Sequence, residues 1–155
     1  MTGAGPEGRL AELGIVLPPA PAPAAAYVPT TRVADLVFIS GQIAAGEEGL
    51  LTTGKIGTEL DVEQGADCAR QCALNVLAQL KEALGDLRRV RQVVKLTVFV
   101  ASAPGMTTQH LVANGASELF GQVFGERGHH ARSAVGVAAL PKDSPVEVEA
   151  IVQVE

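Results

Sequence analysis

The sequence predicts an α+β protein of two layers, in which two helices cover one face of a mixed β-sheet. Residues 61–84 and 109–124 carry apolar side chains at helical spacing. Residues 36–42, 93–100 and 132–154 instead carry apolar runs or apolar residues at alternate positions, as strands do. The resulting order is β-β-α-β-α-β-β, which favours helices packed on one side of a sheet.

The first residues differ from the rest in composition. Residues 1–22 are predicted to form an N-terminal extension, partly extended or flexible, and residues 23–155 a single domain. The first eight residues are rich in glycine and are expected to fray. Residues 9–14 favour one or two helical turns that end at a glycine. Proline and alanine dominate residues 17–26, which predicts an extended path rather than a helix.

The first half of the domain has clear boundary signals. Its first strand closes at Gly41, and a segment rich in Gly and Thr follows, which favours a long loop or a ragged hairpin. Asp61 is expected to cap the first long helix together with Gln64, three residues on. Gly85 is expected to end that helix.

In the second half, Val94 and alternate residues after it are expected to share the buried face of a strand. The second long helix is expected to bury five apolar residues: Leu111, Val112, Leu119, Phe120 and Val123. The two closing strands are expected to pair as a hairpin that turns near residues 142–143. Alternate residues from Val146 to Val154 should face the helices. The opposite face of that strand is partly apolar and predicts contact with another copy of the chain.

Composition excludes several classes of protein. The chain is 47% apolar but only 3% aromatic, and its formal net charge is −5. Few stacking platforms and an acidic balance argue against nucleic acid as a partner. No run spans a membrane and no secretory signal is visible, so we expect a soluble cytoplasmic protein with no membrane partner. Cys68 and Cys72 lack zinc-site spacing and are interpreted as half-buried, reduced thiols.

Arg132 stands out among the polar residues. Alternation along its strand puts it on one face with Ala134, Gly136 and Ala138, which are all small. A long cation beside small side chains leaves room for a small anion or for a second chain packed closely. Arg132 is therefore the first candidate for a binding residue.

Four blocks of sequence carry a family resemblance. They are Y-V-P-T-T-R-V-A-D-L-V-F-I-S-G-Q from Tyr27, A-R-Q-C-A-L-N-V-L from Ala69, V-K-L-T-V-F-V from Val94, and the closing A-R-S-A-V-G-V-A-A-L-P-K-D-S-P-V-E-V-E-A-I. Through these blocks, residues 22–154 resemble the Rid family of 2-imino acid deaminases, also called the YjgF or L-PSP family.

The resemblance implies a chorismate-mutase-like α+β fold that assembles as a homotrimer, with binding sites between subunits. It implies no metal ion and no organic cofactor. The implied reaction is the hydrolysis of reactive enamine or imine acids, such as 2-aminoacrylate, to a 2-keto acid and ammonia. The expected partners are a small 2-imino or 2-keto acid and other copies of the chain.

The same resemblance implies the site residues. Arg132 would hold the substrate carboxylate through its guanidinium fork. Glu147 would orient or activate the attacking water, and the Tyr27 hydroxyl would hydrogen-bond the substrate. The remaining positions are expected to line the pocket: Ser40, Gly41, Asn114 and Ala134.

Each of these residues also has a plain structural interpretation. Arg132 could be salt-bridged at a subunit interface, and Tyr27 could be a packed aromatic at a strand start. Glu147 could be merely solvated, since Glu149 has the same alternation and only the family spacing selects between them. In the predicted hairpin, Glu147 lies about 20 Å from Arg132 along the strands. The two would then meet only if hairpins of neighbouring subunits pack together.

The sequence also departs from the family pattern. Ala25 and Ala26 stand where Gly-Pro is frequent, Ala134 where Cys is common, and His129-His130 where an aromatic-Pro pair is frequent. These changes leave alternatives open: a non-catalytic binder of small carboxylates, an endoribonuclease, or a purely structural interaction protein. The two histidines are interpreted as solvated loop residues, in preference to a Ser-His-Asp arrangement with Ser133.

Overall fold

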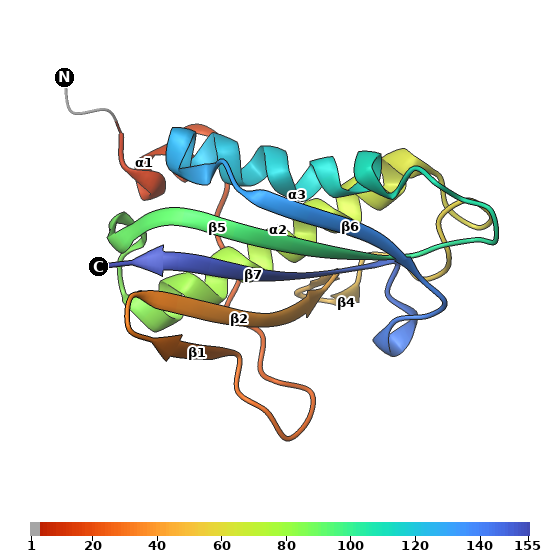
Figure 1. Ribbon diagram of the computed structural model, residues 1–155, viewed down its shortest axis with the longest axis horizontal. Helices are drawn as coiled ribbons and strands as arrows, with labels where there is room; N and C mark the ends of the chain where they lie inside the picture. Colours follow the sequence, from red (N-terminus) through yellow and green to blue (C-terminus); the bar gives the residue numbers. More distant parts are fainter. Residues whose placement is uncertain (1–3) are drawn as a thin grey trace.

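The computed structural model describes residues 4–155 and has two layers, a sheet and a set of helices (Figure 1). Within these residues, five strands form one sheet in the order β1-β2-β7-β5-β6. They are β1 (Thr30–Val33), β2 (Leu36–Ile43), β5 (Val90–Ala101), β6 (Ala131–Val137) and β7 (Val146–Val154). Neighbours pair antiparallel, but β6 runs parallel to β5. The predicted mixed sheet is confirmed.

The second layer consists of α2 (Val62–Leu84) and α3 (Gln109–Phe124), which pass behind the sheet in Figure 1. A short helix, α1 (Pro6–Glu12), packs against α3. The near face of the sheet carries no helix among the described residues. The segment between β2 and α2 contains the small hairpin of β3 (Ala45–Gly46) and β4 (Gly49–Leu50), which is one of the two forms that the sequence favoured.

The boundaries of α2 follow from local chemistry. The Asp61 carboxylate accepts a hydrogen bond from the Gln64 backbone N–H at 2.8 Å, and the Gln64 side chain accepts one from the Asp61 N–H at 2.9 Å. This reciprocal pair satisfies two N–H groups that a helix start otherwise leaves without partners. Gly85 adopts a φ of 76°, a left-handed conformation that glycine reaches without strain, and it ends the helix.

The core lies between the two layers. Alternate residues of β7, from Val146 to Val154, are each at most 3% exposed and face the helices, as predicted. Phe120 from α3 and Leu77 from α2 are fully buried against them. Burial of each such side chain stabilises the fold by roughly 1.5–3 kcal/mol.

The predicted hairpin of the two closing strands is wrong. β6 and β7 are separated by β5, and both pair with it. The helix α3 connects β5 to β6 as a crossover, which brings β6 parallel to β5 at the sheet edge. None of the described residues of β6 is fully buried, whereas β7 buries alternate residues, so β7 takes the centre of the sheet. The connection passes through the short turn η3 (Pro141–Asp143).

Three smaller expectations also need correction. Helix α1 begins at Pro6, so residues 6–8 are helical rather than frayed, and the helix ends at Glu12; the expectation for residues 1–3 lies outside the described residues. Val94 is 37% exposed because a β-bulge near Val93 shifts the alternation, so Val93 is buried instead. Leu111 is 43% exposed, unlike the other four residues of its predicted stripe. Residues 17–26 contain no helix or strand, as predicted.

No helix within residues 4–155 combines the length and the apolar character that a membrane crossing requires.

Candidate functional site

A pocket of about 390 Å³ lies where residues 21–29 pass over the end of β2. We call residues 15–29 the N-terminal arm. Three of the residues singled out from the sequence line this pocket: Tyr27, Gly41 and Glu147. Most of the remaining wall is apolar and comes from the Pro/Ala segment of the arm, while Asn75 and Lys142 add polar groups. The pocket therefore offers a carboxylate, a phenol and an ammonium group beside an apolar wall.

Glu147 reaches this pocket across a glycine. It lies on β7 in register with Ile43 of β2 and Phe99 of β5. A Cβ built on Gly41 would lie 2.1 Å from the Glu147 Oε1 atom, so the carboxylate occupies the space that any other residue at position 41 would fill. The Glu147 side chain is half-buried, and this burial, followed by the nearby charge of Glu149, raises the pKa of its carboxyl. A carboxylate with a raised pKa is a stronger base than a solvated one.

The N-terminal arm is hydrogen-bonded to the rest of the protein. The buried Gln79 on α2 donates from Nε2 to the Pro21 carbonyl oxygen at 2.6 Å. The Ser40 hydroxyl donates to the Val28 carbonyl oxygen at 2.8 Å. Ser40 therefore helps to hold the arm and is absent from the pocket lining, in contrast to the neighbouring Gly41. Tyr27 is 46% exposed, and its hydroxyl accepts a hydrogen bond from the Ala24 N–H at 3.4 Å.

A second cluster forms at the opposite edge of the sheet, between β6 and α3. Arg132 donates from Nη1 to the Asn114 Oδ1 atom and to the Ser117 hydroxyl, at 3.0 Å each, and from Nη2 to the His110 carbonyl oxygen at 3.1 Å. Asn114, which was expected to line the pocket, contacts Arg132 here and does not line the pocket of Tyr27, Gly41 and Glu147. These contacts use three of the five guanidinium N–H groups. Among residues 4–155, one N–H on Nη2 and the one on Nε have no protein acceptor.

Arg132 and Glu147 lie on opposite faces of the sheet. Arg132 is in register with Leu96, which is fully buried beneath the helices, so its side chain starts on the helix-covered face. Glu147 is in register with Phe99, whose neighbours Val98 and Val100 are the buried residues, so Glu147 starts on the other face. A single subunit therefore does not bring the two predicted partners together.

The small residues near Arg132 leave less space than the sequence suggested. A Cβ at Gly136 would lie 2.8 Å from the Gln109 Nε2 atom and 3.0 Å from the Ser102 hydroxyl, so these side chains occupy part of the floor. Ala134 is half-buried and packs against the core. It contributes no side-chain hydrogen-bonding group to the cluster.

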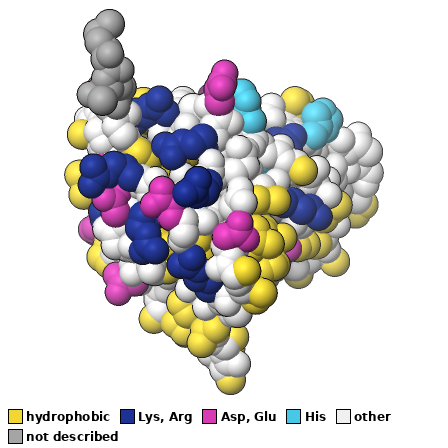
Figure 2. Space-filling view, turned by 60° about the vertical axis from the view of Figure 1, so that its left-hand side comes forward, with side chains coloured by type: hydrophobic (Ala, Val, Ile, Leu, Met, Phe, Trp, Pro, Cys, Tyr) yellow, Lys and Arg dark blue, Asp and Glu magenta, His cyan; other side chains and the backbone are white. Residues whose placement is uncertain are grey.

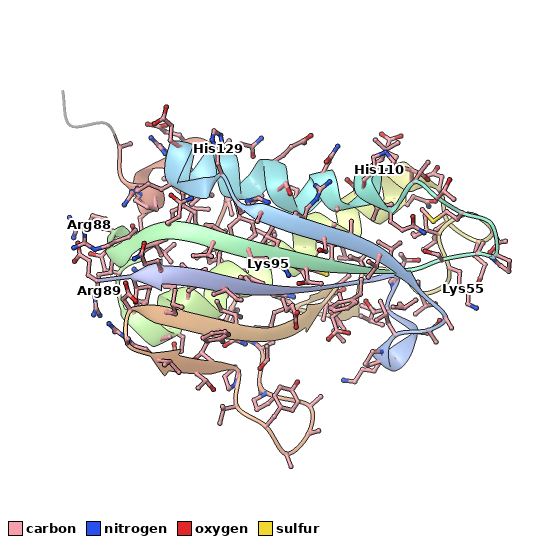
Figure 3. The ribbon with its side chains drawn as sticks, viewed as in Figure 1. Lys55, Arg88, Arg89, Lys95, His110 and His129 are labelled. Carbon is pink, nitrogen blue, oxygen red and sulfur yellow. The ribbon has the colours of Figure 1, made fainter. Side chains whose placement is uncertain are left out.

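Sequence reasoning missed two residues here, Ser117 and His130. Ser117 follows Asn114 by three positions on α3, a spacing that puts both on one helix face and could have revealed it. His130 was expected to be solvated, but it is half-buried, and its Nε2 atom lies 2.8 Å from the Ser117 hydroxyl. The neighbouring His129 is exposed. Figure 3 shows His129 and His110 near the two ends of α3.

Neither cysteine has the environment of a reactive group. Burial and, to a lesser degree, the charge of Asp67 raise the pKa of the Cys68 thiol to about 11. Cys72 is fully buried, and burial raises the pKa of its thiol as well. Within residues 4–155, no three or more His, Cys, Asp or Glu side chains gather as metal ligands would.

Basic side chains gather on one face of the molecule, interspersed with acidic ones (Figure 2). Figure 3 shows Arg88 and Arg89 at the end of the sheet near the C-terminus. Arg88 pairs with Asp86 at 2.6 Å, and Arg91 lies 3.8 Å from the Glu155 carboxylate. Because acidic groups neutralise these cations, the surface differs from the continuous basic stripe that follows a phosphate backbone.

Comparison with known proteins connects these observations to a family. Residues 18–154 match the family profile described as endoribonuclease L-PSP. The chain is 51% identical over 146 residues to protein TCP17 of Trypanosoma cruzi, covering 94% of this chain and 91% of that protein. It is 36% identical over 134 residues to a 2-iminobutanoate/2-iminopropanoate deaminase of Salmonella typhimurium, covering 85% and 90%. Among solved structures, protein Atu1372 of Agrobacterium tumefaciens, described as of unknown function, aligns with a TM-score of 0.90 at 48% identity, covering 97% and 93%.

Proposed function

The chain belongs to the endoribonuclease L-PSP family, also called the Rid family, and from this we propose that it is a cofactor-independent hydrolase of small 2-imino acids. The products would be the corresponding 2-keto acid and ammonia. Relatives named as 2-iminobutanoate/2-iminopropanoate deaminases support this assignment.

The observation that carries the proposal is the environment of Glu147. Its carboxylate lies in a pocket beside the bare backbone of Gly41, is half-buried, and has a raised pKa. A general base works best when its pKa approaches the working pH, which burial of a carboxylate favours. Tyr27 supplies a hydroxyl in the same pocket, and the apolar arm excludes bulk water from one side.

The chemistry needs one anchor and one base. Arg132 would hold the substrate carboxylate with its two remaining N–H donors, in the bidentate manner that suits a guanidinium. Glu147 would remove a proton from water as the water oxygen bonds to the C=N carbon. That proton would pass to the nitrogen and give a carbinolamine. Glu147 would then take the proton of the carbinolamine hydroxyl and pass it to the nitrogen as the C=O bond forms and the C–N bond breaks, which releases ammonia and the 2-keto acid. Tyr27 would hydrogen-bond the substrate during these steps.

Such a site requires two copies of the chain. Arg132 and Glu147 start on opposite faces of the sheet, so one subunit cannot direct both at one small substrate. We therefore extend the proposal to a homotrimer with sites between subunits. The uncovered face of the sheet, which exposes the apolar residues Phe38 and Val135, supports association through this face.

The first test is hydrolysis of imino acids generated in situ by an L-amino-acid oxidase. Wild-type protein should accelerate the reaction, and Arg132→Ala should abolish the acceleration while keeping the wild-type oligomeric mass. Arg70→Ala is the matched control, because Arg70 also contacts α3 from another element, through Gln122, yet lies outside both clusters. Full activity of Arg132→Ala would overturn the assignment.

The second test concerns the shared site. Co-expression of Arg132→Ala with Glu147→Gln chains mixes two inactive variants. If each site takes its arginine and its glutamate from different subunits, random mixing restores about one quarter of the sites. No recovery in mixed oligomers would contradict the intersubunit site while leaving the reaction itself open to the first test.

Two other functions are distinguishable in the same experiments. A non-catalytic binder would bind 2-keto acids through Arg132 and yet hydrolyse no imine; the alanine at position 134, which offers no side-chain donor, favours this alternative. An endoribonuclease, the activity in the family's description, would bind RNA with strong salt dependence. The net charge of −5 and the paired arginines argue against it.

A further inference from the structure

A chain of hydrogen bonds runs outward from Arg132 through residues that the proposed reaction does not use. Arg132 Nη1 lies 3.0 Å from the Ser117 hydroxyl oxygen, which lies 2.8 Å from His130 Nε2. The other ring nitrogen, His130 Nδ1, lies 2.6 Å from the Gly128 carbonyl oxygen. Gly128 ends the short turn η2 (Gly125–Gly128) that follows α3.

The direction of each bond in this chain is fixed by its ends. A guanidinium only donates, so Ser117 accepts from Arg132. A carbonyl only accepts, so His130 Nδ1 must carry a proton and donate to Gly128. In a neutral ring Nε2 then has a free lone pair, which accepts the single proton of the Ser117 hydroxyl. All four groups are satisfied only while the imidazole is neutral.

The surroundings of His130 favour the neutral ring. Burial lowers the pKa of His130, and the positive charges of Arg132 and His129 lower it further, against the opposing effect of the Gly128 hydrogen bond. Helix α3 presents the Ser117 hydroxyl and the Phe120 ring, whose centroid lies 6.2 Å from that of His130. The turn η2 presents the Gly128 carbonyl, and β6 presents Arg132. None of these neighbours carries a carboxylate that would stabilise an imidazolium.

Protonation would reverse one bond. A charged ring donates from both nitrogens, so the Ser117 oxygen would face donors from both His130 and Arg132. Two cations would then share one hydroxyl oxygen, and its proton would have to turn elsewhere. Repulsion between the imidazolium and the guanidinium would weaken the arrangement that holds Nη1 of Arg132 in place.

We propose that Ser117 and His130 form a positioning pair for Arg132, which holds the guanidinium so that the N–H on Nε and one N–H on Nη2 remain free for a substrate carboxylate. The inference rests on the proposed role of Arg132 as the carboxylate anchor. Ser117 acts on the substrate only through Arg132, and His130 acts only through Ser117. Both residues lie outside the four sequence blocks that carry the family resemblance.

The test measures binding of 2-oxobutanoate by calorimetry as a function of pH, in the intact oligomer. Ser117→Ala should weaken binding about tenfold at pH 7.5, the effect expected when a hydrogen bond to a charged group is lost. In the hydrolysis assay the same variant should raise KM with little change in kcat, because the Glu147 base is untouched. Wild-type affinity in Ser117→Ala would overturn the proposal.

The pH dependence separates positioning from a merely structural role. Because the pKa of His130 is lowered by burial, the ring becomes charged only at pH values below the ordinary histidine pKa of about 6.5, and wild-type binding should weaken there. We call this loss of affinity at low pH the acid limb of the binding curve. Protonation of Glu147 would strengthen the binding of an anion, so it cannot produce the acid limb. His130→Gln should keep near wild-type affinity at pH 7.5, since its amide oxygen can accept from Ser117, and should lose the acid limb. His129→Gln, the adjacent exposed control, should retain the limb.

The outcomes distinguish this proposal from the proposed function. If the wild type binds 2-oxobutanoate through Arg132 and hydrolyses no imine, the reaction is wrong, and the positioning pair is still judged by the affinities of its variants. If the acid limb persists in His130→Gln, the pair is wrong and the reaction stands. If the wild type binds no 2-keto acid, the role of Arg132 as carboxylate anchor and the positioning pair are both overturned, and the reaction is judged by the hydrolysis assay alone.

Discussion

Replacement of Gly41 by alanine should disable the site although no reacting group is itself replaced. Gly41 lies on β2 and does not adopt a positive φ, so an alanine fits its backbone conformation. The new Cβ would lie 2.1 Å from Glu147 Oε1 and 2.9 Å from its Cδ. The glutamate is flexible and only half-buried, and it would move aside rather than force the strands apart.

The size of the effect follows from that displacement. To reach an ordinary contact of about 3.4 Å, the carboxylate oxygen must move by about 1.3 Å. A misplacement of about 1 Å in a catalytic group lowers the rate about 100-fold. We therefore expect kcat/KM for imine hydrolysis to fall about 100-fold, with thermal stability close to that of the wild type. Removing the base in Glu147→Gln should lower kcat by roughly 10²–10⁴.

Two further variants make this measurement specific. Gly121→Ala on α3 is the matched control, because its Cβ would meet no atom within 4 Å; it should keep full activity and gain roughly 0.5–1 kcal/mol in stability. The double variant of Gly41→Ala and Glu147→Gln should be no slower than Glu147→Gln alone, because both act on one carboxylate. Wild-type kcat/KM in Gly41→Ala would refute the reasoning, since the carboxylate would then not be needed where it lies.

Four other outcomes are expected. Gly115→Ala should lower the free energy of unfolding by about 1–3 kcal/mol in urea denaturation, because its Cβ would lie 1.9 Å from the Ala66 carbonyl oxygen of the facing helix; an unchanged midpoint would contradict this close approach. Gln79→Leu should release the N-terminal arm from its hydrogen bond to α2, and limited proteolysis should cut the arm about tenfold faster than in the wild type. The Cys68 thiol should not react with Ellman's reagent until the protein unfolds, because it is buried and its pKa is raised to about 11; rapid reaction of the folded protein would contradict its burial. Glu147→Gln should raise Tm slightly at pH 7. Folding raises the pKa of the Glu147 carboxyl, so the ionised carboxylate destabilises the wild-type fold as the pH rises through that pKa. The difference in Tm between the variant and the wild type should therefore disappear below about pH 4.5, the ordinary pKa of a glutamate, where the carboxyl is protonated in both the folded and the unfolded state.

The elements that depend on local sequence were predictable. The capping box of Asp61 and Gln64 and the left-handed Gly85 bound α2 as expected, because each involves residues within one helical turn. Alternation along β7 likewise gave its buried face. Alternation failed on β5, where Val94 was expected to be buried. A single β-bulge near Val93 shifts the alternation there, and the pattern of side chains alone does not reveal such a bulge.

The site was only partly predictable. Family spacing selected Glu147 over Glu149, and the structure has Glu147 in the pocket with Tyr27 and Gly41, while Glu149 does not line it. Ser40 was expected in the same pocket but turns toward the arm. Nothing local in the sequence assigns its hydroxyl to the carbonyl of a residue twelve positions away.

By itself, the sequence determined the fold class, the two long helices and the residues of β7 that share its buried face. These properties depend on backbone geometry and on neighbours a few positions apart. Only the tertiary structure decided that β6 pairs with β5 and not with β7, and hence that Arg132 and Glu147 lie on opposite faces of the sheet. It also decided that His130 meets Ser117. The physical reason is that strand pairing depends on where the α3 crossover returns the chain, and alternation carries no information about which strand becomes the neighbour.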